Sequence, residues 1–117
     1  PDGKFLAFVS DRSGRPQVYI MDMQSRQVRR LTFQGTENAE PSWSPKGKTI
    51  VYTGLTDSHY RIFTISVNGG SSTRISSGPG DFESPTWSPD GKQIAFSRKG
   101  MGTQQIYVVF ANGKGQR

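Results

Sequence analysis

Pro-Ser-Trp-Ser-Pro-Lys-Gly-Lys, residues 41–48, sets the organisation of the whole chain because the sequence repeats it. It returns as Pro-Thr-Trp-Ser-Pro-Asp-Gly-Lys at residues 85–92, a step of 44 residues. The chain also opens on the second half of this motif, Pro-Asp-Gly-Lys at residues 1–4, again 44 residues before its counterpart. A period of about 40 residues is typical of proteins built from stacked structural units. We therefore interpret the sequence as one unit that occurs about three times.

Each unit contains an apolar segment of strand length, such as Phe-Leu-Ala-Phe-Val-Ser at residues 5–10. Large apolar residues recur in step at two positions of each unit: Leu6 and Phe8, Ile50 and Tyr52, Ile94 and Phe96. The residue between them is smaller in every unit: Ala7, Val51 and Ala95. Because strand side chains alternate between the two faces of a sheet, large residues occupy one face and small residues the other. This pattern suits sheets that stack against one another.

A second strand is predicted at residues 17–21, 61–65 and 105–109 of the three units. These segments are rich in β-branched and aromatic residues, which fit a pleated and packed surface. Their aromatic residues, Tyr19, Phe63 and Tyr107, keep the step of 44 residues. The repeat therefore extends well beyond the Trp motif.

Short turns and outer strands complete each unit. Asn68-Gly69 and Asn112-Gly113 predict two-residue hairpin turns, since Asn and Gly readily adopt the positive φ that these turns require at both positions. The first unit has Gln24-Ser25 instead, so its hairpin is less well specified. We expect the outer strands at residues 28–32 and 73–76.

The complete unit consists of a short Trp strand, a Pro-Asp-Gly turn and three further strands. Pro suits the second position of the turn and Gly supplies the unusual backbone angle that follows, while Lys46 in place of Asp weakens the turn slightly. Loops at residues 34–40 and 77–84 lead to the next Trp strand. No helical periodicity is present, so the fold class is all-β. We predict a β-propeller of four-stranded antiparallel blades, with about 2.7 repeats of 44 residues present.

The repeat divides the single domain, residues 1–117, into a partial blade at 1–34, a full blade at 41–76 and a partial blade at 85–117. The first unit has no Trp strand, and the third stops at Arg117, where its outer strand would begin. Propellers typically close with about 4–8 blades. We therefore expect the coding sequence to continue beyond both ends, or the chain to form a homo-oligomer through its open blade edges.

Composition excludes several classes of protein. The chain has no cysteine, which rules out disulfides and thiolate catalysis, and no apolar run approaches the ~18 residues of a membrane span, so we expect no membrane insertion. The net charge of +6 comes from 15 Lys and Arg against 9 Asp and Glu. Because the basic residues are spread through turns and strand ends, we interpret them as a solvated surface and expect no nucleic-acid partner.

Several short motifs carry a resemblance to a known repeat. They are Ser-Pro-Asp-Gly-Lys at 88–92, Ser-Asp-Arg at 10–12, Pro-Gln-Val-Tyr at 16–19, Arg-Leu-Thr at 30–32 and Glu-Pro-Ser-Trp-Ser-Pro at 40–45. Together they resemble the TolB-type β-propeller family over essentially the whole chain. The resemblance implies a six-bladed, non-catalytic propeller of the periplasmic Tol-Pal system, which binds the peptidoglycan-associated lipoprotein Pal and serves cell-envelope integrity, cell division and protein transport. The family's TolA-binding N-terminal domain has no counterpart in these residues.

The resemblance also implies where the partner binds, at the mouth of the central channel and just before each Pro-x-Trp motif. In this sequence the positions are Ala39 and Glu40 in one unit, and Glu83 and Ser84 in the next. The candidate set also contains two neighbouring residues, Glu37 and Asn38. Loops at residues 10–16 and 54–60 are expected to contribute, because binding residues concentrate on loops held by a rigid scaffold. Alternatively, Glu40 and Glu83 are solvated acids, or they cap free amides near the start of a strand.

Other side chains with chemical potential fit structural roles. Trp43 and Trp87 are of a residue type that stacks on ligands, but their fixed place in the repeat favours core packing. His59, the only histidine, fits a surface loop. The sequence contains no Gly-x-Ser-x-Gly nucleophile motif and no phosphate-binding loop. We therefore expect no catalytic residue, no metal site and no cofactor.

Two alternatives to a Pal-binding propeller remain open. One is the accessory, substrate-filtering propeller of a prolyl-oligopeptidase-type serine peptidase. A following α/β-hydrolase sequence with the nucleophile motif would favour it. The other is a propeller fragment that assembles a closed ring from copies of itself.

Overall fold

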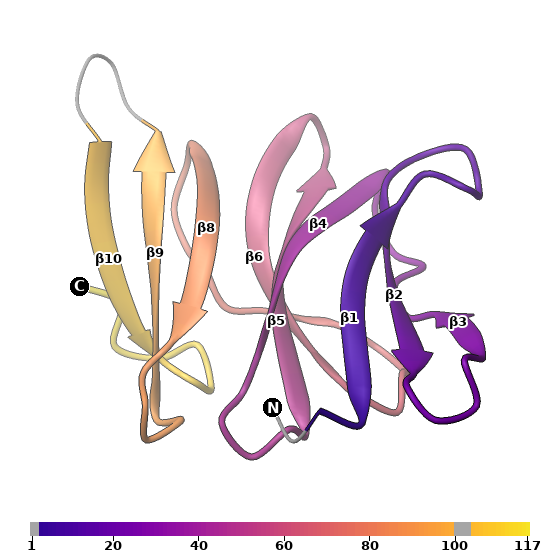
Figure 1. The fold of residues 1–117 in the computed structure, drawn as a ribbon. Coiled ribbons are helices and arrows are strands. Elements are labelled where there is room, and N and C mark those ends of the chain that lie inside the picture. The colour runs from indigo at the N-terminus through magenta and orange to yellow at the C-terminus, as the bar shows by residue number, and fades with distance from the viewer. Residues whose placement is uncertain (1–2, 100–103) are drawn as a thin grey trace.

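The chain folds into three antiparallel β-sheets that stand side by side (Figure 1). The computed structural model describes residues 3–99 and 104–117, and these residues form ten strands and no helix. Pro1 and Asp2 of the opening turn motif lie outside the described residues. Within the described part, no helix is long and apolar enough to cross a membrane. The all-β prediction is confirmed.

The central sheet is a complete four-stranded unit. Its strands, in spatial order, are β4 (Glu37–Trp43), β5 (Thr49–Thr56), β6 (His59–Ser66) and β7 (Thr73–Arg74). β5 and β6 pair without interruption from Thr49 opposite Ser66 to Thr56 opposite His59. This is the antiparallel arrangement that the repeat predicts for one blade.

The two flanking sheets have three strands each. The first contains β1 (Phe5–Ser10), β2 (Gln17–Asp22) and β3 (Val28–Arg30), and the third contains β8 (Asp81–Trp87), β9 (Gln93–Lys99) and β10 (Gln104–Phe110). Arg117 exchanges two backbone hydrogen bonds with Val108 of β10, at 2.8 and 2.9 Å. The outer-strand position of the third sheet is therefore occupied by the C-terminal residue.

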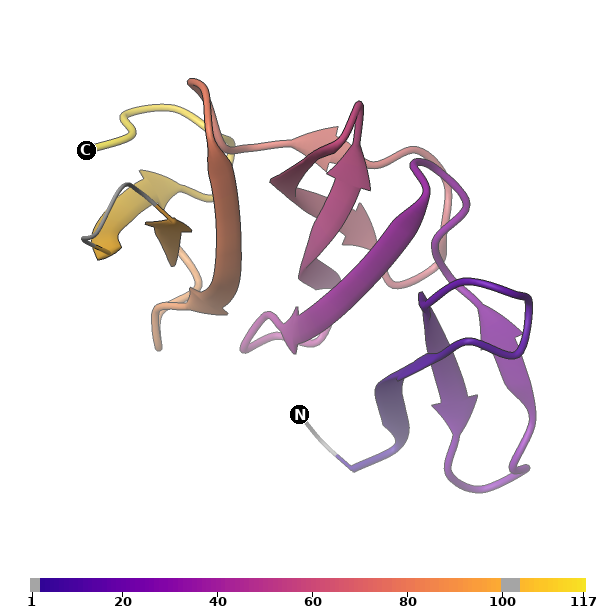
Figure 2. The same ribbon diagram turned by 90° about the horizontal axis from the view of Figure 1, so that it is seen from above.

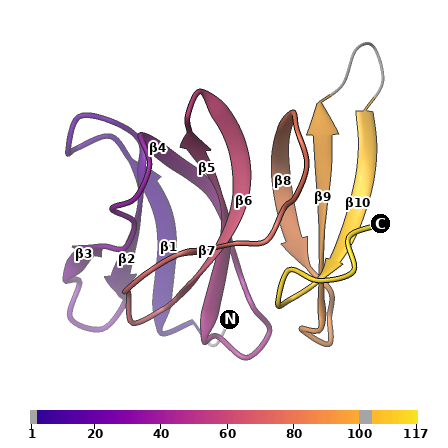
Figure 3. The same ribbon diagram turned by 180° about the vertical axis from the view of Figure 1, so that it is seen from behind.

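The three sheets pack face to face and form two hydrophobic cores, one at each junction. Seen from above, they spread as a fan (Figure 2), and the view from behind shows β7 on the outer side of the central sheet (Figure 3). The first core joins β2 and β3 to the central sheet through Val18, Ile20, Leu31, Ile50, Tyr52 and Ile65. The second joins the central and third sheets through Val51, Ile62, Ile75, Phe82, Ile94, Phe96 and Val109.

Alternation along β5 explains how one sheet serves both cores. Ile50 and Tyr52 face the first sheet, whereas Val51 between them faces the third. All three side chains are at most 1% exposed. Burial of each contributes about 1.5–3 kcal/mol. Trp43 and Trp87 pack against the edges of the two cores, in agreement with the packing role inferred from the repeat.

The segments predicted as loops before each Pro-x-Trp motif are strand over about half of their length. β4 begins at Glu37 and β8 at Asp81, and each contains a register shift, between Ala39 and Ser42 in β4 and between Glu83 and Thr86 in β8. Pro41 and Pro85 cannot donate a ladder hydrogen bond, so the ladder is interrupted there. A β-bulge lets each strand continue past its proline and redirects the side chains beside it.

The hairpin turns also differ from their prediction. Gly69 has φ of 94° and its N–H donates to the Ser66 carbonyl at 2.9 Å, whereas Asn68 is not among the residues with positive φ. Two consecutive positive φ angles occur at Gly69 and Gly70, at 94° and 100°. At non-glycine residues they occur at Asp57 and Ser58, at 51° and 67°, between β5 and β6. In each Asn-Gly pair only the glycine therefore adopts the left-handed conformation. The turns are thus not the two-residue type that requires positive φ at both Asn and Gly.

Candidate functional site

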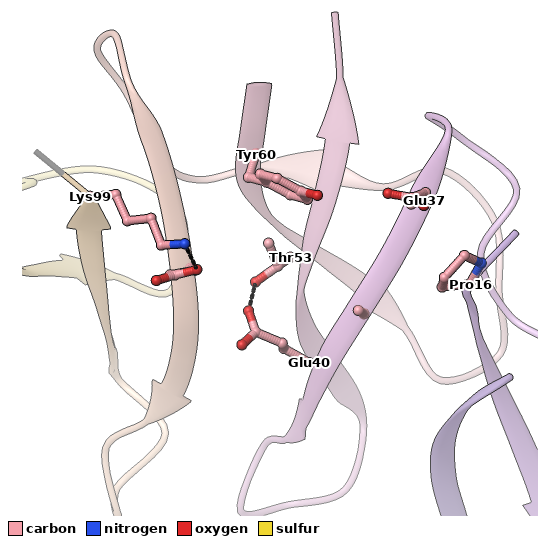
Figure 4. A pocket seen from close by; sticks show the side chains of 8 residues that line it. Pro16, Glu37, Glu40, Thr53, Tyr60 and Lys99 are labelled. Carbon is pink, nitrogen blue, oxygen red and sulfur yellow. Dashed lines mark hydrogen bonds and ion pairs between the residues drawn. The ribbon is translucent and has the colours of Figure 1, made fainter. Parts of the chain in front are cut away.

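A cavity of about 340 Å³ opens at the end of the molecule where β4 and β8 begin (Figure 4). It is lined by residues of all three sheets and their connections: Pro16, Glu37, Ala39, Glu40, Thr53, Tyr60, Glu83 and Lys99. Four of the six residues proposed from the sequence are in this set. The two others, Asn38 and Ser84, lie beside it in β4 and β8. We refer to this cavity as the mouth pocket.

Glu40 connects two blades through its carboxylate. Oε1 accepts a hydrogen bond from the Thr53 hydroxyl at 2.8 Å and another from the Ser84 N–H at 3.0 Å, and Oε2 lies 3.4 Å from the Ser84 hydroxyl. Glu40 and Ser84 are equivalent positions of the repeat, and both have left-handed backbone, with φ of 54° and 57°. The bulge in β8 leaves the Ser84 amide without a ladder partner, and Glu40 caps it.

The other two carboxylates of the mouth pocket are in ion pairs. Glu37 lies 3.3 Å from the Arg15 guanidinium, and Glu83 lies 3.6 Å from Lys99 Nζ. The acidic side chains are 25% and 29% exposed, whereas their basic partners are 62% and 68% exposed. Exposed pairs of this kind contribute only about 0–1 kcal/mol. The two ion pairs therefore hold these carboxylates only weakly.

Asn38 has a structural place in the junction between the first two sheets. It is 2% exposed, and its amide group donates to Gln17 Oε1 at 2.8 Å and to the Gln34 carbonyl at 2.9 Å. Gln17 also accepts from the Thr32 hydroxyl at 2.8 Å. The donors of the Asn38 side chain are thus fully used inside the protein, as is typical of buried polar groups.

Four pocket residues were not singled out individually from the sequence: Pro16, Thr53, Tyr60 and Lys99. Pro16 and Tyr60 lie in the two loops that were expected to contribute. Tyr60 is 41% exposed and is held by its N–H, which donates to Asp81 Oδ1 at 2.9 Å. Thr53 lies in the middle of β5 and Lys99 at the end of β9, where the sequence shows only ordinary strand residues. His59 lies 3.5 Å from the same Asp81 oxygen, in an exposed pair. Among the described residues, no cluster of three or more acidic, His or Cys side chains is suited to a metal ion.

Stacked antiparallel four-stranded units with inward strands and cores between the sheets define the β-propeller class of proteins. Residues 1–117 match the model of the TolB β-propeller domain. The chain belongs to this family.

Individual relatives match different shares of the chain. TolB of Francisella tularensis subsp. tularensis is 33% identical over 80 residues, which are 65% of this chain and 18% of that protein. The protein of Bacillus subtilis named uncharacterized peptidase YuxL is 44% identical over 54 residues, 45% of this chain and 8% of its own length. A solved structure of a TolB from Agrobacterium tumefaciens superposes with a TM-score of 0.89 and 29% identity, over 99% of this chain and 42% of that one. The chain thus spans less than half the length of each.

Proposed function

We propose that the chain is a non-catalytic, protein-binding part of a propeller in the periplasmic Tol-Pal system. Its partner is a Pal-type lipoprotein, and its role is in cell-envelope integrity and division. The observation that carries this proposal is the mouth pocket, where Glu37, Ala39, Glu40 and Glu83 from two adjacent blades line one cavity. Membership of the TolB propeller family supports the same function.

The chemistry of the pocket suits a partner loop that offers hydrogen-bond donors. Glu37 and Glu83 are partly buried carboxylates that hold their basic partners only at the surface. Tyr60 presents an exposed ring beside them, and such residues are common anchors at protein interfaces. Charge-assisted hydrogen bonds from the partner to these two carboxylates would fix its register. Recognition then rests on shape and hydrogen bonding on a rigid β scaffold.

Calorimetry with a purified Pal-type lipoprotein domain tests this proposal. We expect Glu83→Gln and Tyr60→Ala each to weaken binding by about tenfold, because each removes an interaction of about 1–2 kcal/mol. Thr86→Ala, an exposed position of β8 beyond the bulge, is the matched control and should leave the affinity unchanged. Equal affinity for all four proteins, or no binding by the unaltered chain, would contradict the proposal.

A second candidate is the accessory propeller of a serine peptidase, favoured by the 44% identity to the peptidase YuxL. In that case the mouth pocket would admit peptide substrates to a neighbouring catalytic domain. Sequencing the parent gene downstream of Arg117 separates the two functions. An α/β-hydrolase sequence with a Gly-x-Ser-x-Gly motif favours the peptidase, and its absence favours the lipoprotein-binding protein.

A further inference from the structure

Basic side chains gather at the end of the molecule opposite the mouth pocket. This end, the lower one in Figure 1, is formed by the turns that join β2 to β3, β4 to β5 and β8 to β9, and by the segment after β10. It carries seven exposed basic residues: Lys4, Arg26, Arg29, Lys46, Lys48, Lys92 and Lys114. We call this set the basic face. The acidic residues described at the same end are Asp22 and Asp90.

The repeat itself generates part of this face. Lys4, Lys48 and Lys92 occupy the same position of the Pro-x-Gly-Lys motif in the three units, and all three are exposed. Because the sheets stand side by side, equivalent turns lie at the same end of each sheet. The chain thus presents one lysine per sheet at a common level. The sequence alone shows these residues as scattered, and the fold brings them together.

Charge is sorted between the two ends. Most acidic side chains lie at the mouth end: Asp11, Glu37, Glu40, Asp57, Asp81 and Glu83. The three ion pairs found among the described residues, including Arg15–Glu37 and Lys99–Glu83, are all at that end. At the opposite end, the Asp22 and Asp90 carboxylates accept hydrogen bonds from the N–H groups of their own turns. The positive charge of the basic face is therefore only partly compensated.

We propose that the basic face docks peripherally on the surface of an anionic phospholipid bilayer. Turn tips at one level suit a flat, negatively charged surface, which attracts nearby Lys and Arg side chains. Two apolar side chains, Met23 and Phe110, are 38% and 45% exposed at the same end, as is typical of interfacial contacts. Proteins that hold single-stranded nucleic acid instead track it along a groove lined by stacking aromatic rings. This docking leaves the mouth pocket free on the opposite end.

Flotation of the purified chain with phospholipid vesicles tests the proposal. We expect binding to vesicles with about 30% phosphatidylglycerol but not to pure phosphatidylcholine, and loss of binding between about 0.05 M and 0.5 M salt. The double variant K48E/K92E should lower the partition coefficient at least about 20-fold, since each lysine near the surface is worth roughly a factor of five. The charge-matched control R15E/K99E, at the mouth end, should change it little.

Several outcomes would overturn the inference. Equal losses in K48E/K92E and R15E/K99E would indicate a response to net charge rather than a docking face. Binding to neutral and anionic vesicles alike would exclude the electrostatic basis. A single-stranded oligonucleotide serves as a competitor of the vesicles for the chain. Displacement at an oligonucleotide phosphate concentration below that of the anionic lipid would assign the basic face to nucleic acid. Circular dichroism of both variants establishes that they remain folded β proteins.

Discussion

At the scale of single residues, the carboxylate of Glu40 illustrates how a site residue can also hold the fold. The family resemblance places Glu40 among the residues that bind a partner. The hydrogen bonds to Thr53 and Ser84 indicate an additional role at the junction between the second and third sheets. Of the two alternatives that the sequence left open, the structure favours the cap on a free amide.

We therefore predict that Glu40→Ala lowers the free energy of unfolding by about 1 kcal/mol, because the Ser84 amide loses its acceptor. Glu40→Gln keeps an acceptor oxygen and should cost less. Urea unfolding of the three proteins measures the difference. Identical midpoints for Glu40→Ala and the unaltered chain would show that the bonds to Ser84 contribute nothing.

Tyr52 leads to a prediction about pH. Burial raises the pKa of its hydroxyl above the ordinary value of 10.0, and the hydrogen bond with Ser72 lowers it in part. The folded state thus holds the Tyr52 proton more tightly than the unfolded state does. The contribution of the protonated hydroxyl to the free energy of unfolding is therefore complete below pH 10 and is lost as the pH rises further. We expect Tyr52→Phe, which cannot ionise here, to lose less stability than the unaltered chain between neutral pH and the region above pH 10. Parallel losses in urea titrations at the two pH values would refute this.

At the scale of strands, Gly54 in β5 is fixed by its surroundings. A Cβ atom there would lie 2.7 Å from Asn38 Oδ1 and 3.0 Å from the Phe63 ring. Asn38 is held by its buried hydrogen bonds, so it cannot withdraw without losing them. We predict that Gly54→Ala destabilises the fold by about 2 kcal/mol through overpacking, measured by thermal unfolding. Thr86→Ala, on an exposed strand face, is the control, and an equal effect in both would argue against a steric origin.

The sequence predicted much of the architecture but less of its connections. The repeat was sufficient to predict the strands of one blade. The alternation of Ile50, Val51 and Tyr52 was sufficient to predict that both faces of the blade pack against neighbouring sheets. The bulges after Ala39 and Glu83 were missed, because a proline within a strand is a signal for a loop in the sequence. The hydrogen bond that satisfies the Ser84 amide comes from a neighbouring blade, which the local sequence does not show. The partners of Glu40 lie one repeat or one strand away, and no local pattern reports them.

At the scale of the whole molecule, the outer faces of the end sheets are apolar. Leu6 of β1 is 45% exposed and Ile106 of β10 is 68% exposed, although equivalent positions of the central sheet are buried. Exposed apolar surfaces of this kind favour association. We predict that the purified chain dimerises, and light scattering after size exclusion measures its mass. A monomer at all accessible concentrations would exclude self-association through these faces.

The bond between Glu40 and Ser84 joins two residues that are 44 positions apart, the length of one repeat. If a gene segment of this length is duplicated in tandem, the carboxylate acceptor and the amide donor are duplicated together. Each new blade then already contains the groups that form this bond with its neighbour. The coupling also has a direction, because Glu40 acts on the following blade. The position of Glu40 in the third unit is occupied by Ser84, which has no carboxylate to offer onward.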